Sequence, residues 1–523
     1  MRVDRRGLLL GIGFVLGLVG LKLLLQLKNH PFLLTILLVL PFLIHELYWK
    51  RRNLPPGPTP WLTVGNMVSL ATANFDEIMA HWRRKYGGIY TVWIGPFPLV
   101  MVNEVHTMKK YFVQHGELFS NRWRNFATDS FMGGANGVIQ IDGEKWREQR
   151  RFSLHVLRDF GVGQQLMEKK ILSEVRQLTA YLRGREEVDL CTPLAICVGN
   201  IINDMLFGVT FPQGSSEMKR LHSLLDAQSR LVVHPLMGLY LAFPFTSKMP
   251  LLDGPWKELI RHRDALWEFL GRQVNDHVAL FEQGHSVDDF TFAYLEEIER
   301  RKQSGDPGHF DLWQLQMLLL DLFFAGMETT VTTLKWAFLL VVHKPEVMRR
   351  IQAELDGLNV EEIGLADRSR ASYTQAAVCE IQRIANILPI NLLRTVSEDV
   401  RIDGYFYPKG TMVIPQIATM LNDETVFEDP SDFRPERFLD EEGKLKRVEQ
   451  FMPFSLGKRQ CLGESLARAE LFLIFANVLK QFDVCPVPGE NYSRQRTLGL
   501  TVSPQKYAVR LAPRKLDANM NIV

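Results

Sequence analysis

A long apolar segment, residues 312–342, constrains the fold of this chain more than any other stretch. Its only charged residues are Asp321, Glu328 and Lys335. Each charge at the centre of a bilayer would cost about 2.5–3.5 kcal/mol, which disfavours a lipid-facing span. The three charges recur every seven residues and therefore share one face of a helix. We predict a long helix in the core of a large domain, whose polar stripe is either structural or lines a cavity.

The N-terminus carries two further apolar runs, residues 8–27 and 32–44. A bilayer is crossed by about 20 apolar residues, so the first run is the better candidate for a span, and the second is more typical of an interfacial segment. No small-residue cleavage site follows either run, which argues against a removed signal peptide. The basic residues 50–52 favour a cytosolic position for the chain downstream. We predict a membrane anchor within residues 1–48 that crosses once or twice.

Residues 49–60 combine that basic cluster with the sequence LPPGPTP. Proline fixes φ and stiffens a chain, so this stretch predicts a semi-rigid hinge rather than an ordinary loop. Residues 61–523 show no second break in composition and no internal repeat. They predict a single large domain that is mostly α with minor β.

The patterns within this domain predict several elements. We expect a hairpin at 89–94 and 99–102, helices at 164–183, 256–283 and 464–481, a polar surface loop at 296–309, and strands at 499–502 and 507–511.

The charge and the cysteines exclude some functions. A net charge of +2 over 523 residues gives no overall basic field for nucleic acid. The five cysteines are odd in number, widely spaced and without a CxxC pair. A disulfide framework and a structural zinc site are therefore disfavoured, and a reducing compartment fits best.

Four motifs follow one another in the second half of the chain: AGMETT at 325–330, EIQR at 380–383, FRPERF at 433–438 and FSLGKRQCLG at 454–463. The first marks a helix that either opens a groove or packs closely with a back-bonded Thr329. In the next two, Glu380 and Arg383 share a helix face, and Arg437 could reach the same carboxylate. Such a network fixes geometry more than it stabilises.

The ordered set resembles the cytochrome P450 family of haem-thiolate enzymes. The last motif fits the pattern F-x-x-G-x-x-x-C-x-G through Phe454, Gly457, Cys461 and Gly463. The proline-rich hinge and the stretch WREQRRFS, residues 146–153, most resemble the animal microsomal group called family 2. The resemblance implies the P450 fold, a single large helical domain with small sheets and an N-terminal anchor. It also implies a monooxygenase that inserts one oxygen atom of O2 into an apolar small molecule such as a fatty acid, steroid or xenobiotic.

The resemblance also implies a site built around haem b. Cys461 would be the axial ligand of the iron, where positive charge from Lys458 and Arg459 and the N-terminus of the following helix favour the thiolate. The haem propionates would be held by Trp146, Arg150, Arg459, Arg394 and Arg122, although a surface salt bridge is the alternative for the last two. Glu328 and Thr329 would deliver protons, and Ala325 and Gly326 would leave room for O2.

No flavin or nicotinamide fingerprint occurs in the chain. The resemblance therefore implies electrons from NADPH through a cytochrome reductase, with cytochrome b5 as a second candidate. A basic set could dock an acidic partner or could simply be a solvated face: Arg147, Arg150, Arg151, Lys458 and Arg459.

Pocket-lining segments are expected near 125–136, 387–392 and 498–501. The expected location is the endoplasmic reticulum membrane, with the domain in the cytosol and lipid as a further partner. A haem-thiolate isomerase or dehydratase of lipid peroxides and a non-catalytic haem sensor remain as alternatives.

Overall fold

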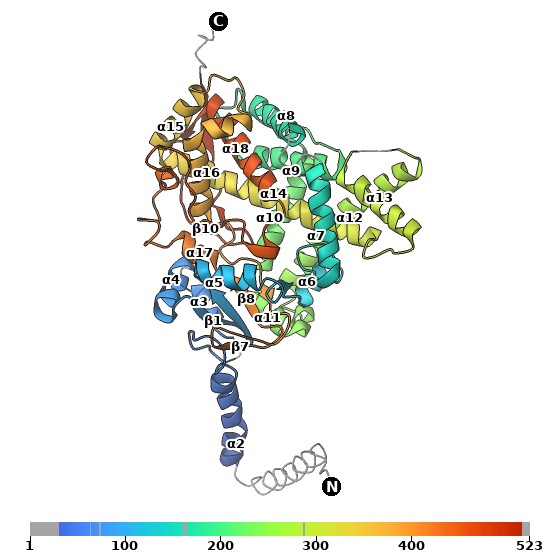
Figure 1. Ribbon diagram of the computed structural model, residues 1–523, viewed down its shortest axis with the longest axis vertical. Helices are drawn as coiled ribbons and strands as arrows, with labels where there is room; N and C mark the ends of the chain where they lie inside the picture. The colour runs from blue at the N-terminus through green and yellow to red at the C-terminus, as the bar shows by residue number, and fades with distance from the viewer. Residues whose placement is uncertain (1–30, 63, 73–74, 160–164, 286–287, 515–523) are drawn as a thin grey trace.

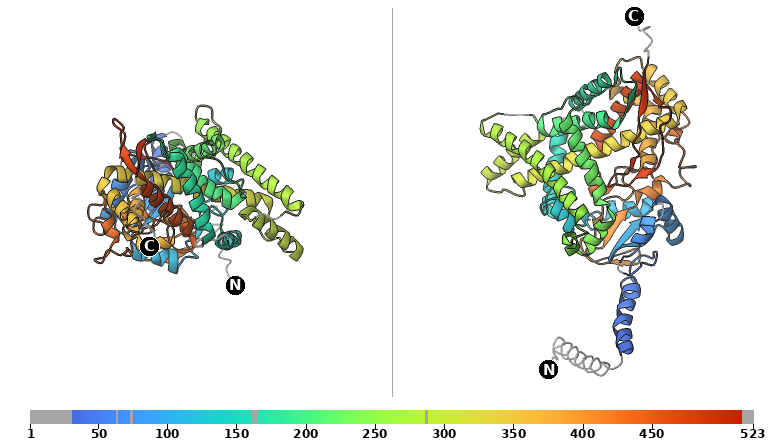
Figure 2. Two further views of the ribbon diagram at one scale, coloured as in Figure 1. Left: turned by 90° about the horizontal axis from the view of Figure 1, so that it is seen from above. Right: turned by 180° about the vertical axis from the view of Figure 1, so that it is seen from behind.

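The computed structural model describes residues 31–62, 64–72, 75–159, 165–285 and 288–514. A mostly helical body surrounds one central helix, and a small sheet lies at the end of the body from which α2 projects (Figure 1; Figure 2 shows the same arrangement from above and from behind). This arrangement agrees with the predicted fold class.

The α-helices of the first half are α2 (Pro31–Ile44), α3 (Met67–Thr72), α4 (Phe75–Tyr86), α5 (Val105–Lys109), α6 (Phe126–Phe131), α7 (Gly143–Asp159), α8 (Gln165–Leu182), α9 (Cys191–Phe207), α10 (Ser216–Val232), α11 (Pro235–Ala242) and α12 (Gly254–Glu282). Those of the second half are α13 (Phe290–Ser304), α14 (Leu312–His343), α15 (Pro345–Asp356), α16 (Ser372–Ala385), α17 (Ile417–Leu421) and α18 (Glu464–Gln481). Short helical turns are η2 (His45–Trp49), η3 (Lys110–Gln114), η4 (Pro244–Lys248), η5 (Ala366–Arg370), η6 (Pro435–Phe438) and η7 (Gly457–Arg459).

Helix α14 confirms the predicted core helix. It starts where the Asp311 carboxylate accepts the backbone N–H of Gln314, and it ends just before Pro345, which cannot continue a helix. Within the described residues it is the one helix long and apolar enough to cross a bilayer, but 72% of its most apolar window is buried inside the body. Burial in protein accounts for its apolar character.

The main sheet has the strand order β1-β2-β8-β5-β3. Its strands are β1 (Ile89–Ile94), β2 (Phe97–Val102), β3 (Asn121–Arg122), β5 (Arg394–Thr395) and β8 (Met412–Pro415). The predicted hairpin is confirmed as the antiparallel pair β1 and β2, and β2 runs parallel to β8. The remaining strands form small sheets: β4 (Glu187–Val188), β6 (Val400–Ile402), β7 (Tyr405–Tyr407), β9 (Phe482–Pro486), β10 (Arg496–Thr497), β11 (Ser503–Pro504) and β12 (Val509–Pro513).

Two element predictions were wrong. Of the surface loop expected at 296–309, residues 305–309 are loop, whereas residues 296–304 belong to α13, where Glu297 pairs one turn on with Arg300 and Arg301. The helix ends at Gly305, where φ is +74°. Residues 499–502 are not a strand but connect β10 to β11, and the strand expected at 507–511 lies two residues later, as β12. The predicted helices at 164–183, 256–283 and 464–481 are confirmed as α8, α12 and α18.

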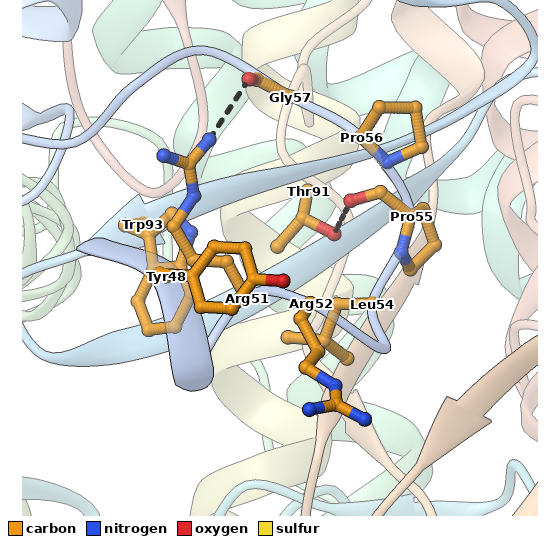
Figure 3. A pocket seen from close by; sticks show the side chains of 9 residues that line it. All are labelled: Tyr48, Arg51, Arg52, Leu54, Pro55, Pro56, Gly57, Thr91 and Trp93. Carbon is orange, nitrogen blue, oxygen red and sulfur yellow. Dashed lines mark hydrogen bonds between the residues drawn. The ribbon is translucent and has the colours of Figure 1, made fainter. Parts of the chain in front are cut away.

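The proline-rich hinge lies along β1 (Figure 3). The Thr91 hydroxyl donates to the carbonyl of Pro55, and the Thr91 N–H donates to that of Pro56, both at 2.9 Å. A side chain on Gly57 would lie 1.9 Å from the Thr91 carbonyl oxygen, so only glycine permits this approach. On the N-terminal side of the hinge, the second apolar run, residues 32–44, lies within α2. The first run, residues 8–27, lies outside the described residues.

Candidate functional site

The Cys461 loop is shaped by close backbone contacts. Gly457 has φ +71°, and a Cβ there would lie 1.9 Å from the carbonyl oxygen of Phe112. The N–H of Cys461 donates to the carbonyl of Phe454 at 2.9 Å and closes the loop. Helix α18 begins at Glu464, so the thiol stands just before a helix N-terminus.

The Cys461 side chain is solvent-accessible although protein surrounds it on most sides. Burial raises the pKa of its thiol, while the N–H of Gly463 and the guanidinium of Arg150 act in the opposite direction. Lys458 and Arg459 were predicted to supply that positive charge, but Lys458 pairs with Glu117, whereas Arg459 binds Asp142 at 2.9 Å. The protein alone leaves a thiol, and a bound metal would make it a thiolate.

Three of the predicted arginines, Arg122, Arg394 and Arg459, are buried together. Arg459 stacks over the ring of Trp146 at 3.9 Å and donates to the carbonyls of Ser120 and Ile141. The surface salt bridge considered for Arg122 and Arg394 is not found among the described residues, where both guanidiniums point inward to main-chain carbonyls.

Burial, together with the like charge of neighbouring guanidiniums, lowers the pKa of Arg459 to about 8 and that of Arg122 to about 10. It also lowers the pKa of Arg394, on which Arg122 and Arg150 act as like charges. Asp142 is the carboxylate within ion-pair distance of this cluster among the described residues. Buried positive charge in such excess fits an anionic ligand with more than one carboxylate, as the two propionates of haem would provide.

A carboxylate that the sequence left without an assigned role organises this cluster. Asp321 of α14 accepts the N–H groups of Val138, at 2.6 Å, and Ile139, at 2.9 Å. The carbonyls of the same two residues accept hydrogen bonds from Arg459 and Arg122. Burial raises the pKa of Asp321 to about 7. Asp321 thus fixes the backbone of Val138 and Ile139, whose carbonyls bind Arg459 and Arg122. The only sign of this role in the sequence was a charged residue within an apolar helix.

Thr329 lies on a partly accessible stripe of α14 together with Leu322 and Ala325, whereas the helix around them is mostly buried. Its hydroxyl donates to the carbonyl of Ala325 at 2.7 Å, as in the close-packing alternative. Gly326 does not open space for O2, because a Cβ there would lie 2.4 Å from Ile202. It permits α9 to approach α14 instead.

Glu328 is buried on a different side of α14, with 3% of its surface exposed. Its Oε1 accepts the hydroxyl of Thr501 at 2.8 Å and that of Thr332 at 3.4 Å. Burial raises the pKa of this carboxyl to about 7, which suits a group that exchanges protons near neutral pH. Thr501, from a segment expected only to line the pocket, is a partner that the sequence did not reveal.

The predicted network around Glu380 is present and buried. Arg383 binds Glu380 through two nitrogens, at 2.7 and 2.8 Å, and Arg437 reaches the same carboxylate at 3.2 Å. Arg383 also donates to the carbonyls of Leu421 and Pro430. The network therefore ties α16 to the chain that leads into the Cys461 loop.

The basic set proposed for docking is less exposed than its sequence suggests. Arg147 pairs with Glu144 at 3.1 Å and with Glu117 at 3.5 Å. Arg150 donates to the carbonyl of Gln460 at 2.7 Å and so lies beside the Cys461 loop. Glu117 therefore neutralises part of the charge on this face.

Comparison with known proteins adds to this geometry. A family model described as Cytochrome P450 matches residues 55–511. Cytochrome P450 2B4 of Oryctolagus cuniculus is 35% identical over 494 residues, which cover 92% of this chain and 99% of that protein. Cytochrome P450 2J5 of Mus musculus and cytochrome P450 2J2 of Homo sapiens are each 34% identical, and each alignment covers 90% of this chain and 94% of the relative.

Proposed function

This chain belongs to the cytochrome P450 family of haem monooxygenases, and from that premise we propose that it oxidises an apolar small molecule with electrons from NADPH. One atom of O2 enters a fatty acid, steroid or xenobiotic, and the other leaves as water. The observation that carries the proposal is the accessible Cys461 thiol beside buried arginines in excess over carboxylates.

The residues present fit haem b. Cys461 would bind the iron, while Trp146 and the guanidiniums of Arg122, Arg150, Arg394 and Arg459 would hold the propionates. Haem with a thiolate ligand would supply the activation of O2 and the cleavage of its O–O bond. Glu380, Arg383 and Arg437 join α16 to η6, in the stretch of chain that precedes the loop with the thiol.

Glu328 and Thr329 would manage protons on the distal side. Thr329 lies on the accessible stripe, and its hydroxyl, which donates to Ala325, can still accept a hydrogen bond. Glu328 binds Thr501 and lies on a different side of α14 from Thr329. A proton on Glu328 would therefore reach Thr329 by rotation of the carboxyl or through an intervening water.

The substrate would lie against largely apolar chain. We expect its lining from the segments 125–136, 387–392 and 498–501. Two exposed apolar side chains in the last two segments are Ile390, at 38%, and Leu498, at 68%. An apolar pocket discriminates poorly between molecules of similar size, so the substrate class stays broad.

The anchor at 1–48, the hinge at 49–60 and the domain at 61–523 remain our proposal for the organisation of the chain. Exposed apolar side chains near α2 support membrane contact, among them Trp49 at 57% and Trp61 at 68% exposure. Aromatic residues of this kind favour the membrane–water interface. We place the domain on the cytosolic side of the endoplasmic reticulum, where a reductase and cytochrome b5 can reach it.

The experiment combines the purified full chain with reductase, NADPH and a lipid extract, and products are identified by mass spectrometry. A new product that carries one oxygen from O2 and requires NADPH supports monooxygenation. Turnover of lipid peroxides without NADPH would instead identify an isomerase or dehydratase, and haem binding without product would identify a sensor.

The thiolate is tested separately with Cys461→Ser. We expect loss of the carbon monoxide difference spectrum of the thiolate-bound haem, because a hydroxyl is a far weaker ligand. Cys485→Ser, a change at a partly buried cysteine outside this loop, should leave the spectrum unaltered. An unchanged spectrum in Cys461→Ser would refute the assignment.

A further inference from the structure

A histidine of α10 lies against the buried carboxylate of Glu328. Nε2 of His222 is 3.9 Å from Oε2 of Glu328, and the two side chains are 14% and 4% exposed. Oε2 has no hydrogen-bond partner among the described residues, whereas Oε1 accepts from Thr501. A buried carboxylate oxygen without a donor is costly, and His222 is the ionisable group that faces it.

Helix α10 is fixed against the same site. The N–H of Leu500 donates to the carbonyl of Ser229 at 2.8 Å, and the N–H of Thr501 donates to the Ser229 hydroxyl at 3.2 Å. Because Thr501 in turn binds Glu328, three parts of the chain converge on one carboxylate. The position of His222 beside Glu328 is therefore built into the packing.

A polar line also leads outward from His222. Asp226 follows one turn later on the same face of α10, and 29% of its side chain is exposed where it pairs with Arg230. His222 and Asp226 are thus both partly accessible to solvent. On the inner side of this line lies the buried Glu328, and the next residue, Thr329, belongs to the accessible stripe of α14.

We propose that His222 is a relay and positioning residue that resupplies Glu328 with protons from the α10 side. The inference rests on the proposed role of Glu328. In the relay step the Nε2–H bond of His222 breaks and an O–H bond forms at Oε2 of the ionised Glu328, while Nδ1 takes a proton from a hydronium ion of the solvent, which leaves as water. One proton enters, one leaves and no electron moves. The gap is about 1 Å longer than a hydrogen bond, a distance that a side-chain rotation can close.

The charges around the pair suit such a relay. Burial lowers the pKa of His222 to about 4 and raises that of Glu328 to about 7. Asp226 on α10, Lys335 on α14 and Asp189 ahead of α9 also act on His222. His222 is neutral near pH 7 and so has both a donor and an acceptor nitrogen, as a relay requires.

The test uses the full-length haem protein with reductase and NADPH, and it measures peroxide released per NADPH consumed, with or without an added substrate. His222→Phe removes both nitrogens, and His222→Gln keeps a donor but cannot relay. We expect both to release at least about threefold more peroxide, a small part of the 10²–10⁴-fold effect of general acid catalysis. The solvent deuterium isotope effect should rise in both variants, and the pH profile of coupling should shift.

Lys219→Gln, an exposed change on the same helix, is the matched control and should behave as the wild type. The carbon monoxide difference spectrum shows whether each variant is folded with haem bound. If His222→Phe does not fold, the conclusion depends on His222→Gln alone. A purely structural role would lower the yield of folded protein without changing the isotope effect. Wild-type coupling and isotope effect in well-folded His222→Gln would overturn the inference while leaving monooxygenation intact. Absence of reductase-driven turnover in the wild type would overturn the proposed function itself.

Discussion

At the scale of single residues, the position of the thiol depends on one glycine. Gly457 combines a left-handed backbone conformation with direct contact to the main chain at Phe112. Arg394 donates to the hydroxyl of Ser455 and the carbonyl of Leu456 just before it. The Cys461 loop is thus held by the main chain at Phe112 on one side and by the guanidinium of Arg394 on the other. A shift of the loop backbone would disturb both contacts.

Gly457→Ala should therefore disturb haem binding. The positive φ alone costs about 1–3 kcal/mol, and a Cβ 1.9 Å from a carbonyl oxygen forces the loop to move as well. We expect a lower haem content and a smaller carbon monoxide difference spectrum per mole of protein. Gly489→Ala is the control, because its φ is +85° but nothing lies within 4 Å of the added Cβ. Equal haem content in the two variants would show that the clash has no consequence.

At the scale of elements, the sequence predicted what local pattern determines and missed what distant contacts determine. Helix α18 was predicted with its observed bounds, because the glycine before it and the run of good helix formers that follows are local signals. The helix at 296–304 was missed because its polar composition resembles a loop. The contact between Asp321 and Val138 spans 183 positions of sequence, so no local pattern could reveal it. The sequence indicated which residue types to consider for the site, whereas their hydrogen-bond partners from distant segments could not be predicted.

The contact between α14 and α18 contains a buried acid that the sequence did not single out. Glu470 is 1% exposed, and one of its oxygens accepts the hydroxyl of Thr330 at 3.0 Å. Its other oxygen has no partner among the described residues. Burial raises the pKa of this carboxyl to about 8.

This acid predicts a stability that falls as pH rises. Because the folded pKa lies above the unfolded value of about 4.3, its contribution is fully present below pH 4 and is lost progressively as pH rises through 8. Glu470→Gln keeps an acceptor for Thr330 and removes the titration. The variant should gain stability relative to the wild type between pH 6 and pH 9, by a few kcal/mol at most, as measured by Tm. Exposed Glu490→Gln should not change the slope, and parallel curves for Glu470→Gln and wild type would contradict the prediction.

At the scale of the whole molecule, the proposed docking of a reductase would depend on the charge of the face around the Cys461 loop. The predicted basic set is divided in the structure. Arg459 is buried and Arg150 lies against the loop, whereas Arg147, Arg151 and Lys458 are exposed. Of these three, Arg147 and Lys458 share Glu117. A reductase with an acidic surface would have to compete with Glu117 for these two cations.

Glu117→Gln should therefore strengthen docking of the reductase. Exposed ion pairs are worth about 0–1 kcal/mol, so we expect the apparent KM for reductase to fall by about two- to fivefold at low salt. The difference should shrink above about 0.3 M salt, where charges are screened over a few ångströms. Glu282→Gln at the end of α12 removes the same charge elsewhere and should leave this KM unchanged. A KM for Glu117→Gln equal to that of wild type at every ionic strength would mean that the electron donor binds without Arg147 and Lys458, and docking would then have to be sought on another face.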